Sequence, residues 1–254
     1  MQYSRSDNPA ACLTVMRFLS FLFMLLPLLA CTHTATDAPP GPTPAPAPPA
    51  VTISFLSLGD SYTIGEGVTE QARWSVQLAQ QLRQHGTSVA APDIIARTGW
   101  TTQDLQRAIA ASGKQRTYGL VSLLIGVNDQ YQGAGAADYR PHLRELLQTA
   151  TRFAGGRPDR VVVLSIPDWG QTPYAQGRNR AQIGQEIDQF NEVARQECQQ
   201  AGIAFVNITS LTRAAVGDAT QFAPDGLHYS GQHMAQWAEK ALPIAQALVA
   251  ANIE

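Results

Sequence analysis

The chain has 254 residues, of which 44% are hydrophobic, and a formal net charge of −2 from 18 basic and 20 acidic side chains. This balance, with no basic run, lacks the electrostatic footprint of nucleic-acid binding, so we expect no nucleic-acid partner. The composition changes near residue 50, and the roughly 200 residues beyond that point suffice for one domain with a full core.

Residues 1–31 have the features of an export signal. Arg17 precedes a short apolar run, Phe18 to Ala30, which is short for a membrane-spanning helix. The sequence Leu-Leu-Ala-Cys ending at Cys31 resembles a bacterial lipobox, in which the cysteine is lipidated and becomes the new N-terminus. We therefore expect an exported lipoprotein anchored through Cys31 at the periplasmic face or the cell surface. An ordinary signal peptide, giving a secreted or periplasmic protein, is the alternative.

The flanking segments fit this interpretation. Residues 1–15 are polar and add nothing to a signal, so Met16 is our candidate for the true start. Residues 32–50 are dominated by proline and alanine and are expected to form an extended tether. The lipid anchor would be the only contact with a membrane. Cys198, the one cysteine beyond the leader, is expected to be a buried or half-buried thiol on a helix.

From Val51 onward, short apolar runs alternate with amphipathic helical patterns. The expected strands are 51–58, 88–96, 118–125, 161–166 and 203–208, and the expected helices are 72–85, 104–111, 138–153, 181–201 and 231–251. Pro92 indicates an edge position for the second strand. The alternation predicts an α/β domain over 51–254, with a parallel sheet covered on both faces.

The sequence Gly59-Asp60-Ser61-Tyr62 follows directly after the first expected strand. A serine there lies at the carboxyl edge of the sheet, where α/β folds bind ligands. Strand, tight turn and helix would hold the Ser61 hydroxyl at a helix start, close to free backbone N–H groups. Taken alone, the pattern also fits a serine that only caps a helix or a turn.

His228 is the only one of five histidines in a loop rich in functional residue types. Asp225 precedes it by three positions, and on a helical turn such residues share a face. The Asp225 carboxylate could then orient the His228 ring and stabilise its charged form. The alternative is a polar loop in which Asp225 caps the following helix.

Four blocks in one order give the domain its resemblance to a known family. The chain resembles the SGNH hydrolases, also called the GDSL esterase and lipase family. The matching blocks are Gly59-Asp60-Ser61-Tyr62, Gly99, Gly126-Val127-Asn128-Asp129 and Asp225-Gly226-Leu227-His228. Tyr62 departs from the family's nominal leucine, which puts only side-chain packing in doubt. The resemblance implies a three-layer α/β/α, flavodoxin-like fold with about five parallel strands.

The same resemblance implies a serine esterase and assigns its residues. Ser61 would be the nucleophile, His228 the base and Asp225 the group that orients it. The oxyanion would be held by the Ser61 and Gly99 backbone N–H groups and the Asn128 side-chain amide. Gly99 and Asn128 alone would also fit ordinary turns. No cofactor is implied, and the Asp and His residues lack metal-ligand spacing.

Aromatic residues occur in the loops expected to rim this site, at Tyr62, Trp100, Tyr131 and Trp169. They suggest an acyl or aryl pocket or a sugar platform, although they could equally cover core edges. No apolar insertion resembles a lid. Short-chain, aryl and lysophospholipid esters and acetylated sugars therefore remain candidate substrates, for an enzyme that we expect to be a monomer.

Two interpretations remain that assign the chain a function other than ester hydrolysis. A loop after the first strand could cradle the phosphate of FMN, which would make the chain an electron carrier. An FMN-binding function would not explain the Asp225-Gly226-Leu227-His228 block. A tethered, inactive binding module on the same fold is the other, and it leaves a full set of catalytic candidates unexplained.

Overall fold

The computed structural model describes residues 52–250, so the predictions about the leader, the tether and Cys31 lie outside the described residues. Within that range, five parallel strands form one sheet in the order β2-β1-β3-β4-β5. The strands are β1 Phe55–Gly59, β2 Asp93–Ala96, β3 Leu120–Leu124, β4 Val161–Leu164 and β5 Ala204–Val206. The five-stranded parallel sheet is confirmed, and β2 is the edge strand that Pro92 predicts.

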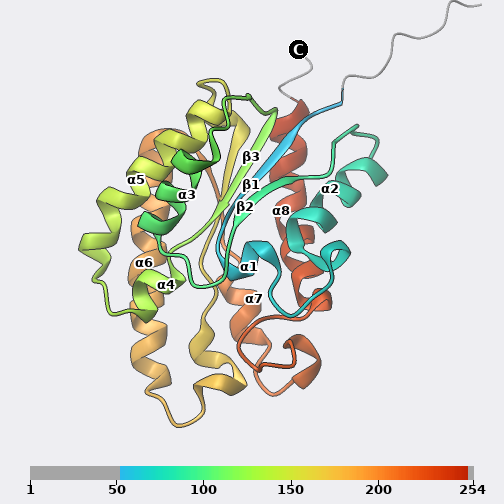
Figure 1. Cartoon of the computed structure of the whole chain (residues 1–254). Coiled ribbons are helices and arrows are strands. Elements are labelled where there is room, and N and C mark those ends of the chain that lie inside the picture. Colours follow the sequence, from blue (N-terminus) through green and yellow to red (C-terminus); the bar gives the residue numbers. More distant parts are fainter. Residues whose placement is uncertain (1–51, 251–254) are drawn as a thin grey trace, which may run out of the picture. The chain divides into compact units, whose positions relative to one another are not determined.

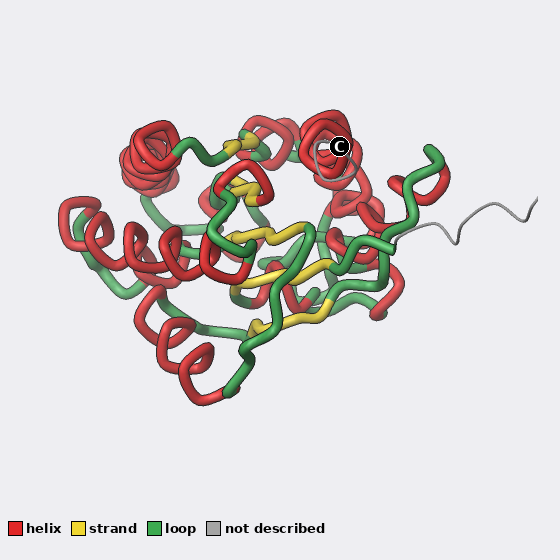
Figure 2. The backbone as a smooth tube through the Cα atoms, turned by 90° about the horizontal axis from the view of Figure 1, so that it is seen from above, coloured by secondary structure: helices red, strands yellow, loops and turns green. Residues whose placement is uncertain are grey.

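Helices cover both faces of the sheet. The helices are α1 Ser61–Ile64, α2 Trp74–Gln84, α3 Thr102–Ser112, α4 Val127–Tyr131, α5 Ala136–Phe153, α6 Arg180–Ala201, α7 Thr209–Ala214 and α8 Gly231–Ala250. One layer contains α2 packed against α8, and the other contains α5 packed against both α3 and α6 (Figures 1 and 2). This confirms the expected three-layer architecture.

The core lies between these layers and the sheet. Every residue of β1 and β3 is buried, because central parallel strands have no solvent face. Trp74 of α2 and Trp237 of α8 are fully buried, and these two helices pack against each other. Burying each large apolar side chain contributes about 1.5–3 kcal/mol, which fixes both layers against the sheet.

Local signals set the ends of the long helices. Thr101 caps α3 in a capping box with Asp104, and Gly202 ends α6 with a φ of 68° that favours glycine. Cys198 on α6 is a buried free thiol, as expected, and its burial raises the pKa to about 12. Within residues 52–250, no helix is both long and apolar enough to cross a membrane.

The sequence did not predict the short helices α1, α4 and α7. Each has only four to six residues, too few to show a helical period. They lie towards the carboxyl edge of the sheet (Figure 1). Two of them begin within the matched sequence blocks, at Ser61 and at Val127, so Ser61 and Asn128 are held at helix starts, whereas Gly99 and the Asp225–His228 segment lie outside helices.

Candidate active site

Ser61 is the first residue of α1, directly after β1, so its hydroxyl is held at a helix start as expected, although α1 itself was not among the expected helices. Asp60 caps this helix, because its Oδ1 accepts a hydrogen bond of 3.0 Å from the Tyr62 amide. Gly59 is required for the turn: a Cβ there would come too close to the Leu124 carbonyl oxygen of β3 and to Thr63. Ser61 is therefore held at a fixed place on the sheet edge with its side chain 4% exposed.

The Asp60 carboxyl group is fully buried, and its Oδ2 has no hydrogen-bond partner. Burial raises the pKa of this group to about 8, more than the Tyr62 amide lowers it, and the nearby Asp129 raises it further. The hydrogen bond of its Oδ1 goes to the backbone of its own loop. The raised pKa favours the protonated form of this carboxyl group, whose Oδ1 holds the turn.

Gly99 lies in an exposed loop with a φ of 83°, a conformation that favours glycine. A Cβ at this position would meet nothing within 4 Å, so the loop borders open space there. Asn128, in α4, points its side-chain amide to the same loop and donates a 3.0 Å hydrogen bond to the Trp100 carbonyl oxygen. An amide nitrogen carries two hydrogens, so one N–H of Asn128 remains available to a ligand.

Further hydrogen bonds join these loops, and no sequence pattern predicts them. Asp129 accepts bonds from the Thr102 amide and hydroxyl, at 3.0 and 2.6 Å. Thr98 donates from its hydroxyl to Glu66, which follows the Ser61 helix. These bonds connect the Ser61 segment to the Gly99 loop and the Gly99 loop to the Asn128 helix, although these residues are far apart in the sequence.

His228 and Asp225 form a direct pair. The His228 Nδ1 lies 2.5 Å from Asp225 Oδ2, and Asp225 Oδ1 accepts the backbone N–H groups of Leu227 and His228, each at 2.9 Å. The segment is a non-helical turn and not the helical turn that we expected. The pair forms all the same because Asp225 folds back on its own backbone, as Asx turns do.

The electrostatics of this pair favour an ionised Asp225. Partial burial, the largest single influence, raises the pKa of its carboxyl group. The bonds from the His228 ring and from the two amides together outweigh it, so the pKa lies below its usual value. A proton held on Nδ1 by this carboxylate leaves Nε2 with a lone pair, the state that a general base needs.

Tyr62 links the serine helix to the histidine loop. Its ring lies edge-on to the His228 ring at 5.5 Å and also contacts the rings of Tyr229 and Trp237. It is only 2% exposed, so it packs in the core beside the site and does not form part of an exposed rim. The tyrosine in place of the family's leucine extends the apolar contact of the histidine loop with α8.

The other aromatic candidates lie in two places. Trp100 is half-buried beside the Gly99 loop, next to its bond with Asn128. Tyr131 and Trp169 contact each other at 5.1 Å between ring centroids, where Tyr131 is 45% exposed and Trp169 is 4% exposed. Only Tyr131 of the four presents a largely open ring. A further exposed tyrosine, Tyr174, packs on Trp169 and was not singled out from the sequence.

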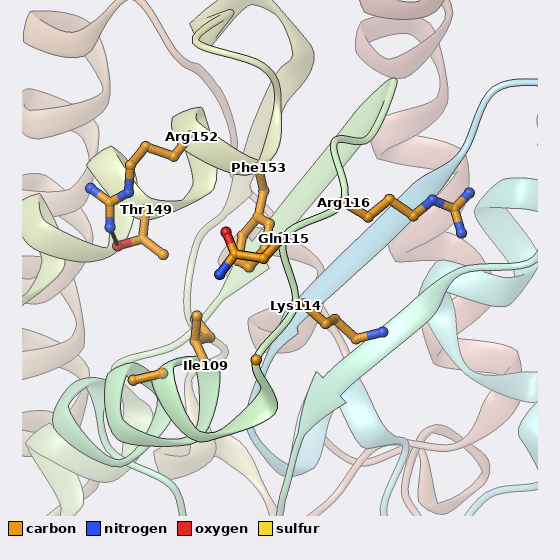
Figure 3. A pocket seen from close by; sticks show the side chains of 9 residues that line it. Ile109, Lys114, Gln115, Arg116, Thr149, Arg152 and Phe153 are labelled. Carbon is orange, nitrogen blue, oxygen red and sulfur yellow. Dashed lines mark hydrogen bonds between the residues drawn. The ribbon is translucent and has the colours of Figure 1, made fainter.

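A separate hollow of about 250 Å³ lies between the C-terminal ends of α3 and α5 and the segment before β3, far along the sheet from Ser61. Figure 3 shows that Lys114 and Arg116 point away from it, and Arg152 turns to Thr149. Lys114 and Arg116 pair instead with Asp93. Among residues 52–250 no cluster of His, Cys, Asp and Glu could hold a metal ion.

The sequence model of the GDSL-like lipase/acylhydrolase family matches residues 57–235, which is most of the chain. The chain belongs to this family. The matched region begins within β1 and ends within α8, so it spans every block of the candidate site. Membership makes the protein a carboxylic ester hydrolase of the GDSL type. No curated protein is significantly similar to it in sequence.

Solved structures share this GDSL fold at low identity. TesA is 19% identical with a TM-score of 0.61, covering 77% of this chain and 99% of its own. The acetyl xylan esterase AlAXEase is 15% identical with a TM-score of 0.60, covering 75% and 98%. The esterase EstA from Pseudoalteromonas sp. is 16% identical with a TM-score of 0.54, covering 79% and 96%. At these identities the likeness concerns the fold.

Proposed function

We propose that the protein hydrolyses carboxylic esters through an acyl-enzyme formed on Ser61, with His228 as the general base and Asp225 as its orienting group. The observation that carries this proposal is the 2.5 Å contact between Asp225 and His228 Nδ1. It lies against Tyr62, the neighbour of a serine held at a helix start. Both contacts support a site in which a nucleophile, a base and an orienting acid act together, as acyl transfer requires.

In the first step, the Ser61 oxygen bonds to the ester carbonyl carbon while its proton passes to His228 Nε2. The bond between the carbonyl carbon and the alcohol oxygen then breaks, and His228 returns the proton to the leaving alcohol. Water, deprotonated by the same nitrogen, attacks the acyl-enzyme, releases the acid and restores Ser61. Asp225 remains ionised throughout and stabilises the imidazolium.

The negative charge on the carbonyl oxygen needs fixed donors. We assign these to the backbone N–H groups of Ser61 and Gly99 and to the free N–H of Asn128. The positive φ of Gly99 and the bond from Asn128 to Trp100 support this assignment, since together they give the two segments a defined separation. Donors that are fixed before the reaction do not have to reorganise as charge develops.

The test is hydrolysis of p-nitrophenyl esters from acetate to palmitate by the wild-type protein and by Ser61→Ala. We expect the variant to lose at least a thousandfold in kcat while it keeps the wild-type unfolding transition. Ser112→Ala, in which an exposed serine at the far end of α3 is changed, is the matched control and should keep full activity. Equal activity of Ser61→Ala and wild type would refute the mechanism.

A carbohydrate O-acetylesterase is the second candidate. The partly exposed side chains of Tyr131 and Tyr174 favour it, because aromatic side chains at a surface can contact sugar rings, and an acetyl xylan esterase is among the structural neighbours. Lysophospholipids and short aryl esters remain within the first proposal. A tethered binding module without catalytic activity is the remaining alternative, and ester hydrolysis by the purified protein would exclude it.

We further propose that the enzyme is an envelope lipoprotein anchored through Cys31, on the strength of the lipobox-like sequence alone. Mass spectrometry of the N-terminal peptide from the native host tests this. A diacylated cysteine is expected, and a peptide that begins upstream of Met16 would contradict the proposed start.

A further inference from the structure

Three aromatic rings surround one guanidinium group beside the candidate active site. The Arg178 carbon Cζ lies 5.0 Å from the ring centroid of Tyr174, 5.4 Å from that of Trp169 and 5.7 Å from that of Tyr131. Each distance is within the range of a cation–π interaction. We call these four residues the aromatic clamp.

The clamp is held rigidly by polar contacts behind it. The Trp169 indole N–H donates to Gln130 at 2.7 Å, and Gln130 donates in turn to Glu186 at 2.6 Å. The hydroxyl oxygens of Tyr131 and Tyr174 lie 2.9 Å apart. All three rings are thus fixed without the aid of Arg178, and they form a preorganised seat for its side chain.

The clamp adjoins both halves of the proposed machinery. Tyr131 lies on α4, three residues after Asn128. The Tyr174 amide donates a 2.9 Å hydrogen bond to the carbonyl oxygen of Gly226, which lies between Asp225 and His228. A substrate held at Ser61 between these two segments would therefore have the clamp beside it, at the border of a hollow of about 340 Å³.

Arg178 is exposed, and in the described part of the chain it forms no ion pair with an Asp or Glu. The only hydrogen bond of its side chain there goes to the Tyr174 hydroxyl at 3.2 Å. A guanidinium has five N–H donors in a planar fork that matches carboxylate and phosphate oxygens. Most of these donors are free, on a cation that the ring faces hold in one place.

We propose that the aromatic clamp is a subsite for a carboxylate or phosphate group carried by the ester substrate. Because Arg178 already fills the space between the rings, the clamp presents donors to an anion and leaves no room for a ligand cation. The inference rests on the proposed function, since it assigns the substrate of the same site. It selects anionic esters from the candidates, either with an acidic acyl chain or with a phosphorylated alcohol.

The kinetic test compares esters that differ in one anionic group. One pair is p-nitrophenyl glutarate and p-nitrophenyl valerate, and the other is a lysophosphatidic acid and the monoacylglycerol with the same acyl chain. We expect wild type to prefer the anionic member of at least one pair. Arg178→Gln should reduce that preference, measured as a ratio of kcat/KM values, about tenfold or more.

Two further variants show whether the position of the charge matters. Arg178→Lys keeps the charge but loses the planar fork, and we expect it to restore only part of the preference. Arg195→Gln removes an equal charge from an exposed pair with Glu192 on α6 and should leave both ratios unchanged. A preference that is absent in wild type, or that Arg178→Gln retains in full, would overturn the subsite.

A binding measurement separates this inference from the proposed chemistry. Tryptophan fluorescence of the Ser61→Ala protein is titrated with glutarate and with glycerol 3-phosphate, and the titration is repeated with Arg178→Gln added. Saturable binding that weakens at least fivefold in the double variant supports the subsite even if no ester is turned over. Binding that is absent, or equal in both proteins, argues against the subsite even if esterase activity is found.

Discussion

Asp129 accepts two hydrogen bonds from Thr102, one from its amide at 3.0 Å and one from its hydroxyl at 2.6 Å. Both residues are buried, and they lie at the starts of α4 and α3, next to Asn128 and close to Gly99. This pair fixes the separation of two of the proposed oxyanion donors. It explains an acidic residue in the Asn128 block that has no chemical role of its own.

Replacement of Asp129 by alanine should therefore reduce kcat by roughly ten- to a hundredfold with little change in KM, because only the transition state needs both donors in register. It should also destabilise the fold by about 1–3 kcal/mol, because two buried donors on Thr102 lose their acceptor. Steady-state kinetics and urea unfolding measure both effects.

Asp104→Ala is the matched control for that variant. Asp104 accepts from the amide and hydroxyl of Thr101 at the same helix start but does not reach α4. It should cost about 1 kcal/mol as a lost cap and leave kcat intact. Equal kcat losses in the two variants would mean that instability, and not the spacing of the donors, lowers the rate.

Asn128→Ala removes a side-chain donor at the proposed oxyanion site. We expect kcat to fall by about a hundred- to a thousandfold, because the negative charge on the carbonyl oxygen loses one of its fixed donors. The variant also loses the bond to Trp100, so Trp100 should be checked by fluorescence for a change of environment. A rise in KM with an unchanged kcat would show that Asn128 only binds substrate.

Asp225→Asn tests the orientation of His228. An asparagine amide can present its nitrogen to Nδ1, which would place the imidazole proton on Nε2 and remove the lone pair that the base needs. We expect kcat to fall by roughly a thousand- to ten-thousandfold at neutral pH. The unfolding free energy at pH 7 should fall slightly, because the variant lacks the contribution that the ionised Asp225 makes to the fold. A loss below tenfold would assign Asp225 to the turn alone.

Asp225 also predicts a pH effect on stability. Its pKa is lowered in the fold, so its contribution to stability is present above the pKa of the unfolded chain and is lost as the pH falls through the folded value. Wild type should therefore lose this contribution below about pH 4, the usual range for aspartate. In Asp225→Asn that part of the acid destabilisation should be missing.

The sequence was sufficient to predict the fold because its long strands and helices carry clear hydrophobic patterns and capping residues. The apolar runs at β1, β3 and β4 and the glycine that ends α6 are local signals, and each one predicted the element found. The short helices escaped prediction because their form depends on the sheet edge beneath them. The bonds from Asp129 to Thr102 and from Glu66 to Thr98 join separate segments, and no sequence period encodes such pairs.

The rim aromatics show where sequence reasoning ends. Tyr62, Trp169 and Tyr131 all follow strands in the same way, yet the first two are buried and only the third is open. Tyr174 and Arg178 complete the aromatic clamp from a loop that carried no motif. Which aromatic ring faces solvent depends on tertiary packing, such as that of Trp237 against Tyr62, and not on spacing.

The buried acid Asp60 gives the last prediction. Its folded pKa of about 8 lies above the usual aspartate value of 3.8, so between these values the folded state keeps a proton that the unfolded chain releases. Stability must therefore fall as the pH rises from about 4 to about 8, by up to about 1.4 kcal/mol per pH unit from this group. Above that range its contribution is constant.

Asp60→Asn removes the titration and keeps the Oδ1 acceptor that caps α1. The free energy of unfolding of the variant, minus that of wild type, should therefore increase steadily between pH 5 and pH 8 when measured by urea denaturation. Asp129, which raises the Asp60 pKa, remains in both proteins and should affect the difference little. Asp218→Asn, at an exposed turn, is the control and should give parallel curves over this range. If the unfolding free energies of Asp60→Asn and wild type instead change in parallel with pH, Asp60 is ionised in the folded protein. Its Oδ2, which has no hydrogen-bond partner, would then be a buried charged oxygen.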